Sequence, residues 1–223
     1  MTSEKPEISR VNRSREDART SYNKMSKWYD TIAKPEKKYI EIGLKNLAVK
    51  EGENVLEIGF GTGDALINLS QSVGDSGKVY GIDISEGMLE VTKSKLEKEG
   101  LLERTRLVLG DAFKLPFDDE FFDVLFMSFT LELFDTPEIP ELLVECKRVL
   151  KSGGRIGVVA ISEKDEDNIM TKLYKWAHMK FPSYVDCRPI YTKQELEKSG
   201  FTIMRLDDFS MWELPVDVVV AKK

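Results

Sequence analysis

The fold follows from Val55-Leu56-Glu57-Ile58-Gly59-Phe60-Gly61-Thr62-Gly63-Asp64, where an apolar strand pattern runs into three glycines at alternate positions. A sharp turn from strand to helix needs backbone angles that a β-carbon forbids, and a ligand approaches the main chain closely only where no side chain intervenes. A helix pattern follows from Asp64 to about Val73, and its free N–H groups would point at that ligand. Glycine-rich turns also occur as plain connections, so this segment alone leaves a purely structural turn open.

Two acidic residues near the turn indicate the ligand. Asp83 closes a second strand pattern, Val79-Tyr80-Gly81-Ile82, and falls 20 residues after Gly63. This is close to the spacing of about 20 at which an acidic side chain binds a ribose hydroxyl pair. Glu57 lies two residues before Gly59, in an otherwise apolar run. A pyrophosphate would be repelled by that charge, whereas a sulfonium or ammonium group would be attracted. The charge therefore favours S-adenosylmethionine over NAD.

The composition argues against several classes of function. The chain has 223 residues, which suits one domain, and its formal net charge of −6 disfavours general nucleic-acid binding. One histidine, His178, and two separated cysteines, Cys146 and Cys187, give no metal-binding pattern. The sequence shows no signal peptide and no apolar run of about 18 residues. We expect a cytoplasmic monomer or homodimer without a metal site or transmembrane segment.

The N-terminal part of the chain has two sections. Residues 1–20 carry few apolar side chains and are predicted as a mobile or helical tail. Residues 21–223 are predicted as a single domain. Within it, 21–50 would form helices that lie over the cofactor as a lid, with Tyr22 or Tyr29 facing the ligand. The three- and four-residue spacing of Tyr22, Met25, Trp28, Tyr29 and Ile32 predicts one helix for the first part of this segment. These helices have an equally simple interpretation as plain packing elements.

Residues 162–191 are interpreted as an insertion on the substrate side of the domain. They include a predicted amphipathic helix from about 163 to 181. The residues in line along this helix are Ile169, Leu173, Trp176 and Met179 or Lys180. His178 lies on the same helix, where a packing or surface role is expected.

The remaining pattern predicts a sheet. Strand and helix patterns alternate from about residue 54 to 160, which is typical of a mostly parallel sheet with helices on both faces. Two last strand patterns, about 202–209 and 216–221, are expected to pair as antiparallel neighbours. Ligands bind such sheets beyond the strand carboxyl ends, where the strand order reverses. Asp111 and Ser128 each follow a predicted strand, so they should join Glu57 and Asp83 at that edge.

In combination, these motifs resemble the class I S-adenosylmethionine-dependent methyltransferases. The stretches that carry the resemblance are Glu57-Ile58-Gly59-Phe60-Gly61-Thr62-Gly63, Gly81-Ile82-Asp83-Ile84-Ser85, Gly110-Asp111-Ala112, Phe122-Asp123-Val124 and Leu150-Lys151-Ser152-Gly153-Gly154. The resemblance implies a Rossmann-like α/β fold with a seven-stranded, mostly parallel sheet and an antiparallel last strand. Within the class, Tyr29-Asp30 with Ile32-Ala33, and Asp111-Ala112-Phe113-Lys114-Leu115-Pro116-Phe117, most resemble the ubiquinone and menaquinone biosynthesis branch.

The resemblance also implies roles for individual residues. Gly59, Gly61 and Gly63 would admit the methionine part of the cofactor, and Glu57 would support its polar end. Asp83 would hold the ribose, and Asp111 with Ala112 would frame the adenine. The other expected cofactor contacts are Ile84, Met88, Ser128 and Tyr22.

Methyl transfer from a sulfonium is an in-line displacement, so much of the catalysis can come from positioning the acceptor and excluding water. A base is needed only if the acceptor arrives protonated. The candidate catalytic residues are Glu132, Tyr29 and Tyr184, followed by His178. Cys187 beside Arg188 suggests a thiol of depressed pKa, although a structural thiol is the simpler interpretation.

The expected acceptor is a small molecule, and a quinone, a lipid and another metabolite all remain open, as does the acceptor atom. One alternative is an NAD-linked oxidoreductase, which needs a third glycine three residues after the second, whereas only Thr62 separates Gly61 from Gly63. The other is a macromolecule-modifying enzyme or a non-catalytic cofactor-binding module.

Overall fold

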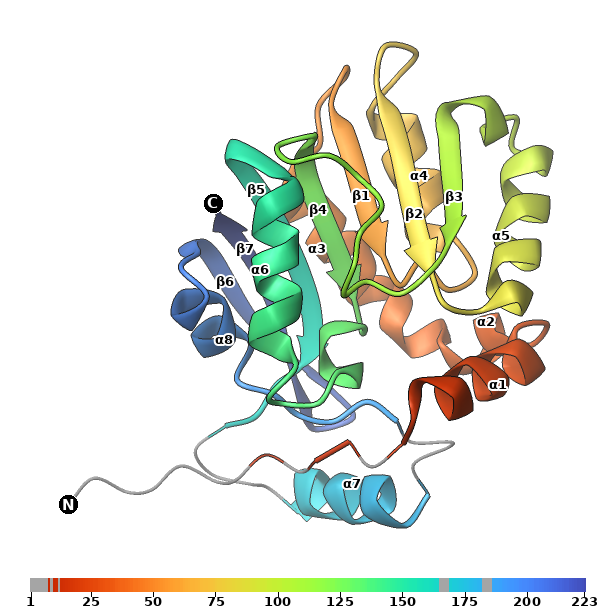
Figure 1. Cartoon of the computed structure of the whole chain (residues 1–223). Helices are drawn as coiled ribbons and strands as arrows, with labels where there is room; N and C mark the ends of the chain where they lie inside the picture. Colours follow the sequence, from red (N-terminus) through yellow and green to blue (C-terminus); the bar gives the residue numbers. More distant parts are fainter. Residues whose placement is uncertain (1–7, 9, 12, 165–168, 182–185) are drawn as a thin grey trace.

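A computed structural model describes residues 8, 10–11, 13–164, 169–181 and 186–223. Its centre is a seven-stranded sheet of order β3-β2-β1-β4-β5-β7-β6 (Figure 1). The strands are β1 (Asn54–Ile58), β2 (Lys78–Asp83), β3 (Thr105–Leu109), β4 (Phe122–Ser128), β5 (Leu150–Ile161), β6 (Thr202–Met211) and β7 (Leu214–Lys222). β7 is antiparallel to both of its neighbours, and the other pairs are parallel. The predicted Rossmann-like sheet with an antiparallel last strand is confirmed.

The order of the strands reverses beside β1. The chain runs outward from β1 to β2 and β3, then returns to place β4 on the other side of β1. The connections on either side of this point leave a crevice at the carboxyl ends of the strands. The site predicted from the sequence therefore has its expected position in the sheet.

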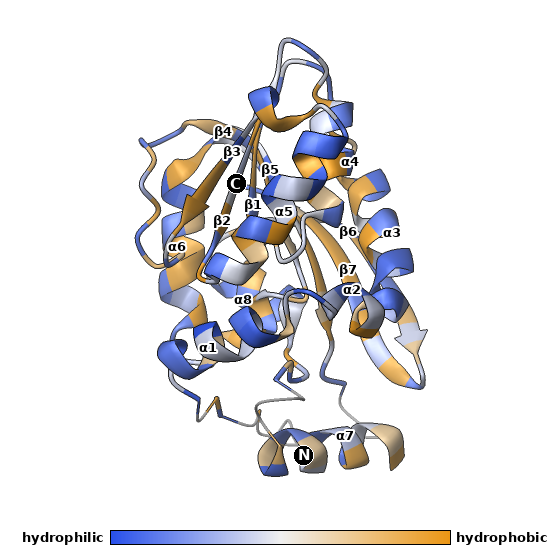
Figure 2. Ribbon diagram, turned by 90° about the vertical axis from the view of Figure 1, so that its right-hand side faces the viewer, coloured by the Kyte–Doolittle hydropathy of each residue, from blue (hydrophilic) through white to orange (hydrophobic). Residues whose placement is uncertain are grey.

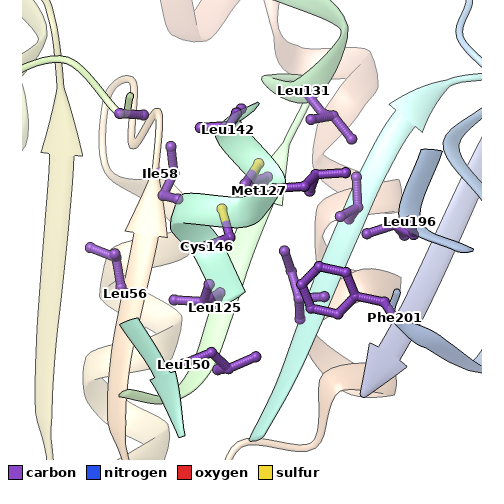
Figure 3. Packing of buried hydrophobic residues seen from close by; sticks show 14 of the residues in the cluster. Leu56, Ile58, Leu125, Met127, Leu131, Leu142, Cys146, Leu150, Leu196 and Phe201 are labelled. Carbon is purple, nitrogen blue, oxygen red and sulfur yellow. The ribbon is translucent and has the colours of Figure 1, made fainter. Parts of the chain in front are cut away.

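Helices cover both faces of the sheet, as predicted. They are α3 (Lys37–Leu47), α4 (Asp64–Ser72), α5 (Glu86–Lys98), α6 (Ile139–Val149) and α8 (Thr192–Lys198). Successive side chains of β1 point to opposite faces, so Val55 joins one hydrophobic cluster with α3 and α4 while Leu56 joins another with α6 and α8. Figure 3 shows the second cluster, where Cys146 of α6 packs among leucines. The interpretation of Cys146 as a core residue is confirmed.

The N-terminal helices differ from the predicted pattern. α1 (Arg15–Met25) begins earlier than the predicted lid, with the Ser14 hydroxyl accepting a hydrogen bond from the Asp17 amide at 3.1 Å. A separate turn, α2 (Tyr29–Ile32), follows. One continuous helix would hold Tyr22 and Tyr29 two turns apart, about 10 Å along its axis. The break instead brings their ring centroids to 6.1 Å, edge to face.

Tertiary contacts explain where α1 ends. The side-chain oxygen of Asn23 accepts hydrogen bonds from the Gly87 amide at 3.0 Å and from the Ser85 hydroxyl at 2.7 Å. These bonds fix the end of α1 against the start of α5. A periodic pattern along residues 21–32 carries no information about such a partner, so it predicted one helix.

Two backbone features of the sheet also depart from simple patterns. Ser152-Gly153-Gly154, part of one of the motifs quoted above, form a bulge within β5, because Leu150 pairs with Phe122 while Arg155 pairs with Val124. The hairpin between β6 and β7 turns through Trp212 and Glu213, which both have positive φ, at 51° and 66°.

The insertion contains α7 (Ile169–Lys180), which both views place at one end of the molecule, away from the sheet (Figures 1 and 2). The predicted helix of about 163–181 is therefore observed from Ile169. None of the helices in the described ranges has the length and apolar character needed to cross a membrane.

Candidate functional site

A cavity of about 470 Å³ opens at the carboxyl ends of β1 to β4. Its size is in the ordinary range of small-molecule sites. Most residues predicted to contact the cofactor line it: Tyr22, Gly59, Gly61, Asp83, Ile84, Met88, Asp111, Ala112 and Ser128. Glu57 and Gly63 line a smaller adjoining cavity of about 60 Å³, which shares Tyr29, Gly59, Gly61 and Ser128 with the larger one. The fold thus brings the predicted residues to one place.

The three glycines of the turn meet different requirements. All have positive φ, but a β-carbon at Gly59 would lie 2.5 Å from Thr130, and one at Gly63 would lie 2.5 Å from Thr92. At Gly61 the nearest atom would belong to Tyr29, 4.0 Å away. Gly59 and Gly63 therefore allow close packing, whereas Gly61 leaves its open side to the cavity.

Asp83 is fixed between the glycine turn and the start of α5. One oxygen accepts a hydrogen bond from the Gly61 amide at 3.0 Å, and the other accepts from the Ser85 amide at 2.9 Å. Burial raises the pKa of this carboxyl to about 6, although the two amide bonds act in the opposite direction. The geometry suits a carboxylate that is held rigidly to receive the hydroxyls of a ribose.

Glu57 is the most unusual residue of the site. Its side chain is buried, and among the described residues its Oε2 atom has no hydrogen-bond partner. Burial raises its pKa well above 4.5, and the charges of Asp83 and Asp64 add to the effect. A cation beside Glu57 would reverse both penalties. The orphaned oxygen and the open Gly61 therefore fit a cofactor that carries positive charge.

An N-terminal strap lines part of the cavity and was not predicted. It consists of the described residues from Arg10 to Ser14 and the first turn of α1. Arg10 forms an ion pair with Asp135 at 2.5 Å, and this bond lowers the pKa of Asp135 to about 2. These residues were predicted as a tail because their acidic partners lie between 96 and 173 residues away in the sequence. The arginines of the strap that line the cavity are Arg10, Arg13 and Arg15.

The strap reaches the predicted adenine end of the site. Arg15 donates to the carboxylates of Asp111 and Glu138, each at 2.9 Å. Its guanidinium also lies 4.1 Å from the centre of the Phe113 ring. Asp111 keeps its second oxygen for the Phe113 amide, at 3.1 Å. Asp111, which is predicted to bind the adenine, is thus held by a hydrogen bond to each of its carboxylate oxygens.

The other end of the cavity is aromatic. The Tyr22 hydroxyl donates to Asp186 at 2.5 Å, and Arg13 forms an ion pair with the same carboxylate oxygen at 3.0 Å. Burial raises the pKa of both Tyr22 and Tyr29 well above 10, with nearby acidic groups contributing. These tyrosines are therefore neutral hydrogen-bond donors at neutral pH.

The other predicted catalytic residues lie elsewhere. Glu132 is fully buried behind the cavity wall, where one oxygen accepts a bond from the Ile161 amide at 3.0 Å. Burial raises its pKa to about 8. His178 is buried on α7. Tyr184 lies outside the described residues.

The structure favours the simpler interpretation of Cys187 as a structural thiol over the alternative of a thiol with a depressed pKa. Burial raises its pKa well above 9, and nearby carboxylates outweigh the lowering effect of Arg13. Its sulfur instead lies 3.9 Å from the carbonyl oxygen of Phe129.

Comparison with known proteins agrees with this geometry. The chain is 42% identical over 120 residues to the demethylmenaquinone methyltransferase of Staphylococcus aureus (strain JH9). The matched stretch covers 54% of this chain and 48% of that protein. The chain therefore spans about half the length of the curated relatives that it matches.

Solved structures share the fold along most of the chain. A SAM-dependent methyltransferase from Aquifex aeolicus is 28% identical, with a TM-score of 0.66, over 90% of this chain and 97% of that one. The methyltransferase in the complex with the Haloferax volcanii Trm112 activator has a TM-score of 0.77 over 92% of this chain and 96% of that one, at 16% identity, which shows the fold alone.

The model of the ubiE/COQ5 methyltransferase family matches residues 8–185, a range that includes the strap, the glycine turn and every predicted cofactor residue. The chain belongs to the ubiE/COQ5 methyltransferase family, and its cofactor is S-adenosyl-L-methionine.

Proposed function

We propose that this chain transfers a methyl group from S-adenosyl-L-methionine to a small quinone-type acceptor that lacks a methyl group. Family membership and the similarity to a demethylmenaquinone methyltransferase support the proposal. The observation that carries the methyl-transfer part is the buried carboxylate of Glu57, whose Oε2 atom has no hydrogen-bond partner among the described residues, beside the open face of Gly61. A cationic cofactor suits this pair, whereas the pyrophosphate of NAD does not.

When bound, the cofactor supplies an electrophilic methyl group on a sulfonium sulfur. Glu57 would balance its positive charge, and Gly61 would let it approach the main chain. Asp83 would bind the ribose hydroxyls, while Asp111 with Ala112 would hold the adenine. These assignments use the positions of the residues along one edge of the sheet.

The acceptor would lie at the aromatic end of the cavity. The walls there include Tyr22, Tyr29 and Phe129, which offer flat apolar surfaces for a ring. The raised pKa of Tyr29 supports a role as a neutral donor to a quinone oxygen rather than as a base. We assign Tyr29 to acceptor binding on this ground.

We also propose that α1 and α2 act as the lid of the site. Tyr22 and Tyr29 both line the cavity, and α1 is tied to the domain through Asn23 and Arg15. Such a lid would exclude water from the reacting groups, which is where methyl transfer gains much of its rate. The free thiols of Cys146 and Cys187 are consistent with a reducing, cytoplasmic location for the protein.

The test is a transfer assay with methyl-labelled S-adenosyl-L-methionine and a reduced, demethylated quinone dispersed in detergent. We expect labelled quinone with one added methyl group, identified by mass spectrometry. Fractionated cell lipids and bulk RNA serve as competing acceptors. Label confined to RNA or protein would overturn the quinone proposal, and binding of NADH without any response to S-adenosyl-L-methionine would overturn methyl transfer itself.

A further inference from the structure

α7 is oriented in an unusual way relative to the rest of the protein. Its buried residues are polar, namely Thr171 and His178. Its large apolar residues are exposed instead: Ile169 at 87%, Leu173 at 54%, Trp176 at 48% and Met179 at 63%. A helix that serves only the core of a domain shows the opposite arrangement. The apolar side of α7 is therefore available to contact a partner outside the domain.

The exposed apolar residues form a continuous face. At 100° per residue, Ile169, Leu173 and Trp176 fall within a narrow arc, with Met179 at its edge. Phe181 follows the helix, is 54% exposed and contacts the Trp176 ring with centroids 6.2 Å apart. We call these five residues the α7 face. Contiguous exposed apolar surface of this kind marks an interaction site.

Charge identifies the kind of partner. Lys172 and Lys180 are exposed on the same side of the helix as the α7 face. Long lysine side chains extend their ammonium groups to a polar boundary while their stems stay among apolar groups. Tryptophan also prefers that boundary. The headgroup region of an anionic bilayer suits both kinds of side chain, because apolar groups insert there while the lysine ammonium groups extend to the lipid phosphates.

Size argues against a second copy of this chain as the occupant. A helix of twelve residues is about 18 Å long and about 10 Å wide, so one side of it covers on the order of 200 Å². A stable protein interface needs roughly 800 Å² from each partner. A symmetric contact would also bring Lys172 and Lys180 near their own copies, where like charges repel.

We propose that α7 docks the protein onto the surface of a bilayer that contains anionic lipid, with the α7 face inserted among the headgroups. The other side of the helix faces the domain. Its Tyr174 packs against the same hydrophobic cluster that Tyr22, Tyr29 and Cys187 also contact. Figure 1 shows α7 beyond the carboxyl ends of β1 and β4, the edge of the sheet at which the cavity opens. The value of this position for taking up a lipophilic acceptor rests on the proposed function, but the docking itself does not.

The experiment is co-sedimentation of the full chain with vesicles of phosphatidylcholine containing a minority of phosphatidylglycerol. We expect binding that weakens by about tenfold or more in Leu173→Ser/Trp176→Ser, because the variant removes most of the inserted apolar surface. Both residues are exposed, so the fold should persist, as circular dichroism would verify. Lys172→Glu/Lys180→Glu should lose more binding to these vesicles than to vesicles of phosphatidylcholine alone.

Trp212→Asn is the matched control, because Trp212 is also an exposed tryptophan, at 67%, but lies on the hairpin between β6 and β7. It should bind vesicles like the native chain. Absence of native binding, equal binding by Leu173→Ser/Trp176→Ser, or a native dimer that this variant converts to monomer would each overturn the proposal. Turnover of a detergent-dispersed quinone, measured on the same variants, separates this outcome from failure of the proposed function.

Discussion

Arg15 donates a hydrogen bond from Nη1 to Oδ2 of Asp111 at 2.9 Å, although 96 residues separate them. The strap is therefore attached to the carboxylate that is proposed to read the adenine. Both side chains are partly exposed, at 53% and 38%, so the pair contributes little to stability. The pair matters instead for the cofactor, because it holds the strap against the cavity wall beside Asp111.

Replacing Arg15 should weaken cofactor binding. In Arg15→Gln we expect the dissociation constant of S-adenosyl-L-methionine to rise by about three- to fivefold, mainly through faster release, since a surface ion pair is worth at most about 1 kcal/mol. Stopped-flow binding measures the rates. Arg104→Gln, which breaks a remote ion pair with Asp75, is the control. Equal effects in the two variants would show that the strap does not cover the bound cofactor.

Replacing Glu57 should weaken cofactor binding without lowering the stability of the fold. Glu57→Gln keeps the shape of the side chain but removes a charge that the fold buries, so the melting temperature should stay level or rise. The affinity for S-adenosyl-L-methionine should fall by about tenfold or more, because the counter-charge is lost. Calorimetric titration measures the affinity, with the exposed Glu51→Gln as control. Unchanged affinity would remove the electrostatic argument for the cofactor.

The same carboxylate predicts a pH dependence of binding. Burial holds the pKa of Glu57 well above 4.5, and a bound cation would lower it. Binding therefore releases protons at a pH below the free-state pKa, and affinity should increase as pH rises toward that value. Asp83, whose pKa is about 6, would bind the uncharged ribose hydroxyls and not the positive charge of the cofactor. Titrations from about pH 5 to pH 8 should show this increase in the native chain and a much weaker one in Glu57→Gln.

Glu132 makes a contrasting prediction. Its pKa of about 8 means that the folded state binds an extra proton between the ordinary carboxyl pKa and about 8, so its ionisation destabilises the fold as pH rises. Glu132→Gln keeps an acceptor for the Ile161 amide. The gain in melting temperature should therefore be absent near pH 4 and largest above about pH 8. Because Glu132 does not line the cavity, turnover should persist, and a loss of a hundredfold or more would make it catalytic.

The sequence predicted what depends on local chemistry. The alternating strand and helix patterns of about 54–160 form the expected sheet, and the turn at Gly59 to Gly63 lies with Asp83 and Asp111 along one edge of it. These features follow from alternation, glycine spacing and the rule for ligand sites in parallel sheets. Such patterns are contained in short stretches of the chain, which is why they could be read without the structure.

The features that were missed depend on distant partners. Arg10 and Arg15 looked like part of a tail because Asp135 and Asp111 are far away in the sequence. The periodicity of α7 correctly predicted a helix with Ile169, Leu173 and Trp176 in line. It could not say which side faces the domain, and the structure turns that stripe outward. The periodicity of a helix shows which residues share a side, but it does not show what that side contacts.

The place of β7 in the sheet has a consequence for folding. β6 precedes β7 in the chain but pairs only with β7, so it cannot join the sheet until β7 lies against β5. The two strands should therefore form a hairpin first and add to the sheet as one unit, late in folding. Their turn should slow this step, since both of its residues, Trp212 and Glu213, have positive φ, whereas two-residue hairpin turns of this kind favour Asn-Gly. We therefore expect the rate at which the sheet acquires its last two strands to depend on these two residues at its edge.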